Sequence, residues 1–187
     1  MTKNQFKSQF LLKPQKLKTL DHKLNLKPAA VLIPLVERKT EIFVVLTQRA
    51  LHLRHHPGQV SFPGGRFEPS DIKLSQTAIR ETEEETGIEP SNVEIFGQMG
   101  LYRTVSNYKV TPFLGFVDAN YQLTVDENEV KEVFEVPWRF LLERTSHQIE
   151  TITRRNQEHI VHFMPYEDKM IWGTTALILH DLISHFE

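Results

Sequence analysis

Several features are scarce or missing in this chain of 187 residues. It contains no cysteine, which excludes disulfide bonds and thiol catalysis. No apolar run approaches the roughly 20 residues of a membrane-spanning helix, and the first residues include no hydrophobic segment of the signal-peptide type. Internal repeats, low-complexity segments and interdomain linkers are also missing. Because 40% of the residues are hydrophobic and can form a core, we expect one folded domain in the cytoplasm.

Basic residues are concentrated at the N-terminus, although the net charge of the chain is only −2. Residues 1–27 contain seven lysines and a single acidic residue, whereas residues 28–187 are strongly acidic. We therefore divide the chain into a lysine-rich N-terminal arm, residues 1–27, and one domain, residues 28–187. The arm is expected to be a solvated helix or loop rather than a surface for lipid, nucleic acid or a partner. Its packing contacts are expected from Phe6, Phe10, Leu11, Leu12 and Leu17.

The middle of the chain carries a helical pattern rich in glutamate. From Leu74 onward apolar and polar residues alternate with helical periodicity, and Gly87 is the expected terminator. Ser70 or Asp71 is the expected N-cap. The less polar stripe of this helix consists of Leu74, Ala78, Ile79 and Thr82. The stripe predicts which side of the helix packs on the core.

Three acidic residues share one side of this helix. Glu81, Glu84 and Glu85 stand at i, i+3 and i+4, about 100° from the apolar stripe. Such like-charge pairs cost about 0.2 to 0.5 kcal/mol each, so their presence needs a reason. Carboxylates suit Mg²⁺ or Mn²⁺, whereas the lack of cysteine and of a His-x-x-x-His helix argues against zinc. A plain solvated acidic face is the alternative, which Arg80 and the preceding Gly-Gly turn disfavour.

The stretch from Gly64 to Ile88 resembles the Nudix box. That pattern consists of Gly, five residues, Glu, seven residues, Arg-Glu, an apolar residue, any residue, Glu-Glu, any residue, Gly and an apolar residue. The residues that match it are Gly65, Arg80, Glu81, Glu84, Glu85, Gly87 and Ile88. Two features depart from it: the first acid is Asp71, separated from Arg80 by eight residues instead of seven, and Thr82 occupies an apolar position.

A second motif lies directly upstream, in residues 46–65. It resembles the motif that marks the coenzyme A pyrophosphatase branch of the Nudix hydrolases, which also tends to carry the one-residue insertion in the box. The resemblance places this segment near the coenzyme A site, and its arginines and histidines can donate to phosphate oxygens. The expected substrate-binding residues are Arg49, Arg54, His56, Gln59 and Arg66. A zinc site at His52, His55 and His56 is disfavoured, because their spacing matches no common zinc pattern.

The resemblance also implies roles for the residues of the box. Glu81, Glu84 and Glu85 are expected to hold Mg²⁺ or Mn²⁺. The carbonyl of Gly64 adds a neutral ligand, since glycine there permits close approach of the backbone. Arg80 is expected to orient a glutamate through a salt bridge rather than to contact the substrate.

The general base remains open at this point. Nudix enzymes commonly supply a base or a further ligand from an acidic loop after the box, and residues 126–130 form such a stretch here. Glu129 is the first choice in this loop and Glu127 the second, with two surface acids as the alternative. Glu81 is the candidate from the helix itself.

The remaining pattern is that of a mixed α/β protein. Hairpins are expected from residues 29–36 with 42–47 and from 149–155 with 159–164, and further strands in 93–102, 109–117 and 133–136. Short and long helices are expected in residues 137–143 and 174–186. Together with the box helix, these elements predict an α/β/α sandwich of the Nudix type, with a mixed β-sheet between helices.

The resemblance implies hydrolysis of the diphosphate of coenzyme A or its derivatives to adenosine 3′,5′-bisphosphate and 4′-phosphopantetheine. A Nudix pyrophosphatase acting on another nucleoside diphosphate derivative, such as ADP-ribose or NADH, is the first alternative. A non-catalytic nucleotide-sensing domain is the second, and the three intact glutamates of the box disfavour it. The expected partner is a small-molecule substrate, not nucleic acid or a membrane, and the sequence leaves a homodimer open.

Overall fold

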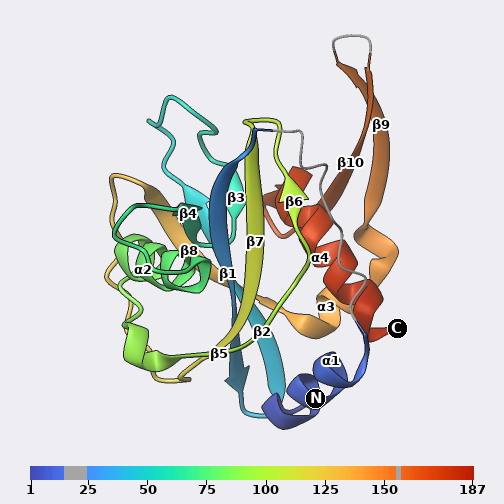
Figure 1. Ribbon diagram of the computed structural model, residues 1–187. Helices are drawn as coiled ribbons and strands as arrows, with labels where there is room; N and C mark the ends of the chain where they lie inside the picture. Colours follow the sequence, from blue (N-terminus) through green and yellow to red (C-terminus); the bar gives the residue numbers. More distant parts are fainter. Residues whose placement is uncertain (15–24, 155–156) are drawn as a thin grey trace.

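The computed structural model describes residues 1–14, 25–154 and 157–187 of the chain (Figure 1). The larger sheet contains β1 (Lys27–Arg38), β2 (Glu41–Arg49), β3 (Val60–Ser61), β4 (Gly64–Arg66), β5 (Val93–Gln98), β6 (Tyr102–Arg103), β7 (Tyr108–Val117) and β8 (Val130–Pro137). The smaller sheet contains β9 (Gln148–Arg154), β10 (Gln157–Tyr166) and β11 (Lys169–Trp172). The helices are α1 (Lys3–Leu12), α2 (Leu74–Thr86), α3 (Trp138–Leu142) and α4 (Gly173–Phe186), with 3-10 turns at Pro90–Asn92 and Arg144–Ser146.

The larger sheet is mixed, as the sequence predicts. Its strands follow the order β3-β2-β1-β7-β5, with β4 paired to β1, β6 to β7 and β8 to β2. The central pair β1 and β7 is parallel, and the other strand pairs are antiparallel. The long, almost uninterrupted apolar run of β1 follows from its central place, because both faces of this strand are covered.

Helices cover both faces of the larger sheet, with α2 on one side and α1, α3 and α4 on the other (Figure 1). Side chains of β1 alternate between the two layers, as strand geometry requires. Ala30 and Leu32 pack with Ala78 of α2, whereas Ile33 and Leu35 join the larger cluster beneath α4. The α/β/α sandwich is therefore confirmed.

The N-terminal segment contributes to the core through α1. Phe6 is fully buried and Phe10 nearly so, and Phe6 packs edge-on against Trp138 of α3 at 5.1 Å between ring centroids. The expected packing of Leu11 and Leu12 is wrong, because their side chains are 61% and 82% exposed on the outer side of α1. The expectation for Leu17 lies outside the described residues, and the division of the chain at residue 27 stays a prediction.

The other predicted elements are confirmed with small shifts of their ends. β1 and β2 form the first hairpin, and β9 and β10 form the late one. The expected strand 93–102 is split into β5 and β6, and β8 begins three residues earlier than predicted. No helix in the described ranges is long and apolar enough to span a bilayer.

Candidate active site

The start of α2 differs from the sequence prediction. Neither Ser70 nor Asp71 is the N-cap; the helix begins at Leu74 with Lys73 in the N-cap position. The side chain of Gln76 accepts hydrogen bonds from the backbone amides of Ile72 and Lys73 at 2.9 and 3.2 Å, which satisfies part of the helix start. Asp71 is thereby free for a different role. The predicted end is confirmed, because Gly87 terminates the helix with φ of 74°, a conformation that favours glycine.

Asp71 holds Arg80 in place. One edge of the guanidinium donates to both oxygens of its carboxylate, from Nε at 3.1 Å and from Nη2 at 3.1 Å. The same carboxylate accepts from the hydroxyl of Thr77 and the backbone amide of Glu68, each at 2.9 Å. These contacts, with that of Arg80 foremost, lower the pKa of Asp71 to about 2. Asp71 is thus a buried anion at neutral pH that fixes the arginine from behind.

Arg80 in turn contacts two of the predicted metal ligands. Its Nη1 donates to Glu81 and to Glu84 at 3.0 Å each, while Nη2 also donates to the carbonyl of Arg66 at 3.2 Å. With the two hydrogen bonds to Asp71, the guanidinium thus donates five hydrogen bonds within the protein, which equals its number of N–H donors. The structure therefore agrees with the expectation that Arg80 orients glutamates, although its role in the reaction stays a prediction.

The glycine pair brings backbone and carboxylates together. Gly64 and Gly65 lie in β4, opposite Val31 and Ala30 of β1. A Cβ at Gly64 would overlap the carbonyl of Ala30, and one at Gly65 would overlap the carboxylate of Glu81. Only glycine leaves room at both positions, so the Gly-Gly sequence allows Glu81 to lie directly against the β4 backbone.

Glu85 is the most deeply buried of the three helix acids. Its side chain belongs to a residue only 4% exposed, and its Oε2 has no hydrogen-bond partner. Burial, together with the charges of Glu81 and Glu129, raises the pKa of Glu85 to about 8, while Arg49 and the Gly64 backbone act in the opposite direction. A buried carboxylate in this state is costly for the fold, which is typical of a functional site.

Glu81 and Glu84 occupy less buried positions on the same side of α2. The Glu81 side chain is 15% exposed, and burial raises its pKa against the opposing effect of Arg80. The Glu84 side chain is 58% exposed and is turned toward Arg80. The three acids thus run from the interior outward to the solvent, in the order Glu85, Glu81, Glu84.

The acidic loop after β7 reaches the C-terminal half of α2. The backbone amide of Thr124 donates to the carbonyl of Thr86 at 2.9 Å, and that of Asp126 to the carbonyl of Glu85 at 3.3 Å. Glu129 lies close enough to raise the pKa of both Glu81 and Glu85. Glu127 and Glu129 are both exposed in the turn that residues 127–129 form. The structure therefore brings the first-choice loop acid to the site.

The arginine-rich loop after β2 begins at the same place. Arg49 ends β2 and acts electrostatically on Glu85, and its backbone amide donates to the carbonyl of Gln59 at 3.0 Å, which closes the loop at its base. Arg54 and His56 lie exposed along the loop, and His56 has φ of 56°. Arg66 follows the glycine pair with a side chain 72% exposed. Arg49 is thus near the carboxylates, whereas Arg54, His56 and Arg66 are exposed at the surface.

The family follows from comparison with known proteins. A family model described as the NUDIX domain matches residues 26–168 of the chain. The chain belongs to the Nudix hydrolase family. A protein of Salmonella newport named as an uncharacterized Nudix hydrolase, NudL, is 41% identical over 184 residues, which cover 97% of this chain and 93% of that protein. The NudL proteins of Salmonella dublin and Salmonella paratyphi B match over the same length at 41% and 40% identity.

Solved structures of other Nudix proteins share the fold. A Nudix hydrolase of M. smegmatis, RenU, aligns with a TM-score of 0.52 at 16% identity and covers 64% of this chain and 73% of its own. The Ap4A hydrolase of C. elegans, in a binary complex, aligns with a TM-score of 0.51 at 20% identity and covers 60% and 80%. At these identities the likeness supports the Nudix fold and nothing finer.

Nudix hydrolases generally use divalent metal ions such as Mg²⁺ or Mn²⁺. The donors on α2 fit a hard cation in chemistry and burial, since the Oε2 atom of Glu85 is buried without a partner beside Glu81. Within the described ranges, however, no three acidic or histidine side chains are drawn together into a finished cation site. The hydrogen bond from Arg80 holds the Glu84 carboxylate toward the solvent, and the helix acids repel one another because their charges have the same sign. Binding would require the carboxylates to turn toward one another.

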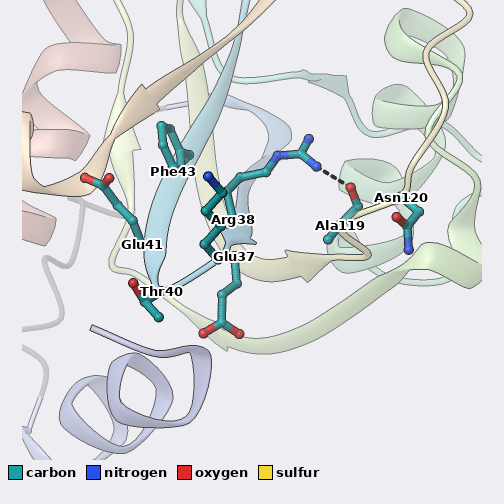
Figure 2. Close-up of a pocket in the computed structure, with 8 residues that line it drawn as sticks. Glu37, Arg38, Thr40, Glu41, Phe43, Ala119 and Asn120 are labelled. Carbon is teal, nitrogen blue, oxygen red and sulfur yellow. Dashed lines mark hydrogen bonds between the residues drawn. The ribbon is translucent and has the colours of Figure 1, made fainter.

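A surface cavity of about 530 Å³ lies away from these residues. It is lined by the turn between β1 and β2, with Phe43, Ala119 and Asn120 (Figure 2). Glu41 begins β2 and Arg49 ends it, so the length of this strand, about 26 Å at 3.3 Å per residue, separates the Glu41 side of the cavity from Arg49. Arg38 crosses it to the carbonyl of Ala119. The charged lining of the cavity consists of Glu37, Arg38, Lys39 and Glu41, which are not among the predicted site residues.

The sequence did not indicate how the site is supported. Asp71 was expected as an N-cap and is the anchor of Arg80 instead. Thr82 seemed misplaced in an apolar position, yet it is fully buried because its hydroxyl donates to the carbonyl of Ala78 at 2.6 Å. The spacing of nine residues between Asp71 and Arg80 contained no signal for this contact, since it depends on the loop that precedes α2.

Proposed function

We propose that the protein hydrolyses the diphosphate of coenzyme A or its derivatives to adenosine 3′,5′-bisphosphate and 4′-phosphopantetheine. In this reaction a water oxygen bonds to one phosphorus, the bridging P–O bond breaks, and the bridging oxygen leaves with the other phosphate. One water is consumed and no oxidant or second substrate is needed. The hydrolase activity rests on the family, and the choice of coenzyme A rests on the motif in residues 46–65.

One junction in the structure carries this proposal. The backbone amide of Ala50, directly after Arg49, donates to the carbonyl of Glu129 at 2.8 Å. This hydrogen bond joins the start of the arginine-rich loop, within residues 46–65, to the acidic loop. The adjacent Arg49 and Glu129 itself both act electrostatically on Glu85 of the Nudix box. The two motifs found separately in the sequence therefore meet at one place. A substrate held by the arginine-rich loop would present its diphosphate to the carboxylates.

The predicted site residues suit distinct tasks. Glu81, Glu84 and Glu85 are the side chains that would hold Mg²⁺ or Mn²⁺, with the Gly64 carbonyl as a further ligand. When bound, such ions neutralise the diphosphate and make a water acidic enough to react near neutral pH. Arg49, Arg54, His56, Gln59 and Arg66 would bind the phosphates and the rest of the substrate.

Proton removal from the reacting water is assigned to Glu81 or Glu129, with Glu127 as the weaker loop candidate. Glu129 lies in a loop that can approach the helix acids, whereas Glu81 is tied to Arg80 at 3.0 Å. The pH–rate profiles of Glu81→Gln and Glu129→Gln distinguish the two, because loss of the base removes the acidic limb of the profile. An acidic limb that survives in Glu129→Gln excludes that residue.

Steady-state kinetics with coenzyme A test the substrate proposal. Arg54→Ala should raise KM several-fold with little change in kcat, because a loop arginine binds substrate and transition state about equally. Arg139→Ala is the matched control. Arg139 is an exposed arginine of α3 that pairs at 2.9 Å with Glu41, the first residue of β2, whereas Arg49 at the site is its last. An unchanged KM in Arg54→Ala removes this loop from the substrate site.

The same assay separates the alternatives. If ADP-ribose or NADH is turned over faster than coenzyme A, the protein is a Nudix pyrophosphatase of another specificity. If nucleotides bind without turnover in the presence of either ion, the protein is a sensor. Both outcomes contradict the proposed substrate, and only the second contradicts the enzyme assignment.

A further inference from the structure

The smaller sheet has an open edge at β9. In the part of the chain that the structure describes, β9 pairs with β10 alone and stands at the end of the order β11-β10-β9. The hairpin of β9 and β10 projects from the body of the molecule (Figure 1). The backbone amides and carbonyls along its outer side are therefore available to another strand.

Apart from the charged residues Glu150 and Arg154, β9 lacks the features by which proteins usually protect such an edge. It contains no proline and no lysine, and its pairing with β10 continues without a bulge from Gln148 to Arg154. It is also rich in β-branched residues, which favour strand pairing. An edge of seven residues without proline or a bulge is a surface that can accept a further strand.

Apolar side chains are exposed on the same hairpin. Ile149 and Ile152 of β9 are 55% and 45% exposed, and Ile160 of β10 is 69% exposed. The pairing register places Ile152 on the face turned away from α4, because His162 and Met164, on the opposite face of β10, are buried beneath that helix. Ile152 therefore offers an apolar contact at the edge in addition to hydrogen bonds, whereas Ile149 and Ile160 lie on the opposite face of the hairpin.

The sequence of β9 is complementary to itself when read in the antiparallel direction. Residues 150–154 read Glu-Thr-Ile-Thr-Arg. If two copies align antiparallel about Ile152, Thr151 stands opposite Thr153, and Glu150 stands opposite Arg154, so that residues of opposite charge face each other at both ends. A two-fold axis requires this kind of self-complementarity.

We propose that two copies of this chain associate through their β9 edges, antiparallel about a two-fold axis at Ile152, to form a continuous six-stranded sheet from the two smaller sheets. The occupant is a second copy rather than an unrelated peptide, because the charge order of residues 150–154 matches its own reverse. The proposal does not depend on the substrate of the enzyme.

Sedimentation equilibrium of the full chain, at concentrations from about 1 to 100 µM, tests the association. The wild type should sediment as a dimer at the upper end of this range. Ile152→Lys places two lysines together at the axis and should raise the dissociation constant at least tenfold. Ile160→Lys is the matched control, since Ile160 is equally an exposed isoleucine of the hairpin but lies in the central strand β10.

A charge exchange tests the alignment itself. Glu150→Arg places like charges opposite each other and should weaken the dimer, and the double variant Glu150→Arg with Arg154→Glu should restore it, because the two charges are only exchanged. Circular dichroism and thermal melting confirm that each variant is folded. A wild type that is monomeric at all concentrations, a dimer weakened equally by Ile160→Lys, or a double variant without recovery overturns the proposal.

Discussion

Replacing Glu85 with glutamine should stabilise the protein while removing its activity. The substitution keeps the shape of the side chain but removes a titratable carboxyl group that is buried, lacks a partner at Oε2, and lies beside two other acids. Because its folded pKa is about 8, this group must take up a proton on folding near neutral pH, which lowers stability. Binding of a cation is the state in which its charge is useful. Glu83→Gln is the matched control, because Glu83 is an exposed acid of the same helix.

The size of the effect follows from the pKa of Glu85. A rise from 4.5 to about 8 corresponds to at most about 5 kcal/mol at 1.36 kcal/mol per unit. The buried amide of glutamine still lacks a partner, which costs about 1 to 3 kcal/mol. The net gain is thus about 2 to 4 kcal/mol, or a rise in Tm of roughly 4 to 16 °C for a chain of this length.

The pH dependence gives the sign of the effect. The folded pKa is raised, so the wild type becomes less stable as pH rises through 4.5, and the loss is complete above about 8. The advantage of Glu85→Gln should therefore be large at pH 8 and be lost at pH 5, where the unpaired amide makes the variant no more stable than the wild type. Differential scanning calorimetry in chelator measures the difference in Tm between the variant and the wild type at each pH. A variant that melts at or below the wild-type temperature at pH 8, or one that keeps wild-type turnover with Mg²⁺, would refute this reasoning.

Three further substitutions test separate parts of the account. Asp71→Asn should destabilise the protein at pH 7 by loosening Arg80. The difference in stability from wild type should shrink between pH 4 and 2, since the lowered pKa of Asp71 means that the carboxylate loses its stabilising effect over this range. Acid titrations followed by circular dichroism measure this difference, and a constant difference contradicts the prediction. Phe6→Ala should lower the free energy of unfolding by about 3 to 5 kcal/mol, measured by urea denaturation, whereas a change below 1 kcal/mol would show that α1 is dispensable for the core. Gly65→Ala should lower kcat at least tenfold, because the added Cβ displaces the Glu81 carboxylate; wild-type kcat would show that this carboxylate is not needed where it lies.

Local patterns in the sequence were enough to predict most elements of the fold. The periodicity from Leu74 and the glycine at position 87 located α2, and the apolar runs around the turn at residues 37–41 predicted the first hairpin. These signals are local, because hydrophobic period and turn residues act within a few positions. The burial of Phe6 against Trp138, 132 residues away, has no local signal.

The site was predicted in part for the same reason. The spacing of Glu81, Glu84 and Glu85 placed them on one side of the helix, but it could not show that Glu85 is the buried one. The deeper burial of Glu85 arises from β4 and from the loop bearing Glu129, because both pack against α2 and the loop contacts its C-terminal residues. The support of Arg80 by Asp71 likewise depends on the path of the loop before the helix.

Product analysis is the most direct test of the central claim. The claim is that the chain is a Nudix hydrolase that cleaves the diphosphate of coenzyme A with metal ions held by its carboxylates. The purified full chain is incubated with coenzyme A, ADP-ribose and NADH in parallel, with Mg²⁺, Mn²⁺ or chelator, and the products are separated by chromatography. We predict adenosine 3′,5′-bisphosphate and 4′-phosphopantetheine from coenzyme A, formed faster than products from the other two and absent with chelator and in Glu85→Gln. Intact coenzyme A in the presence of either ion would contradict the claim.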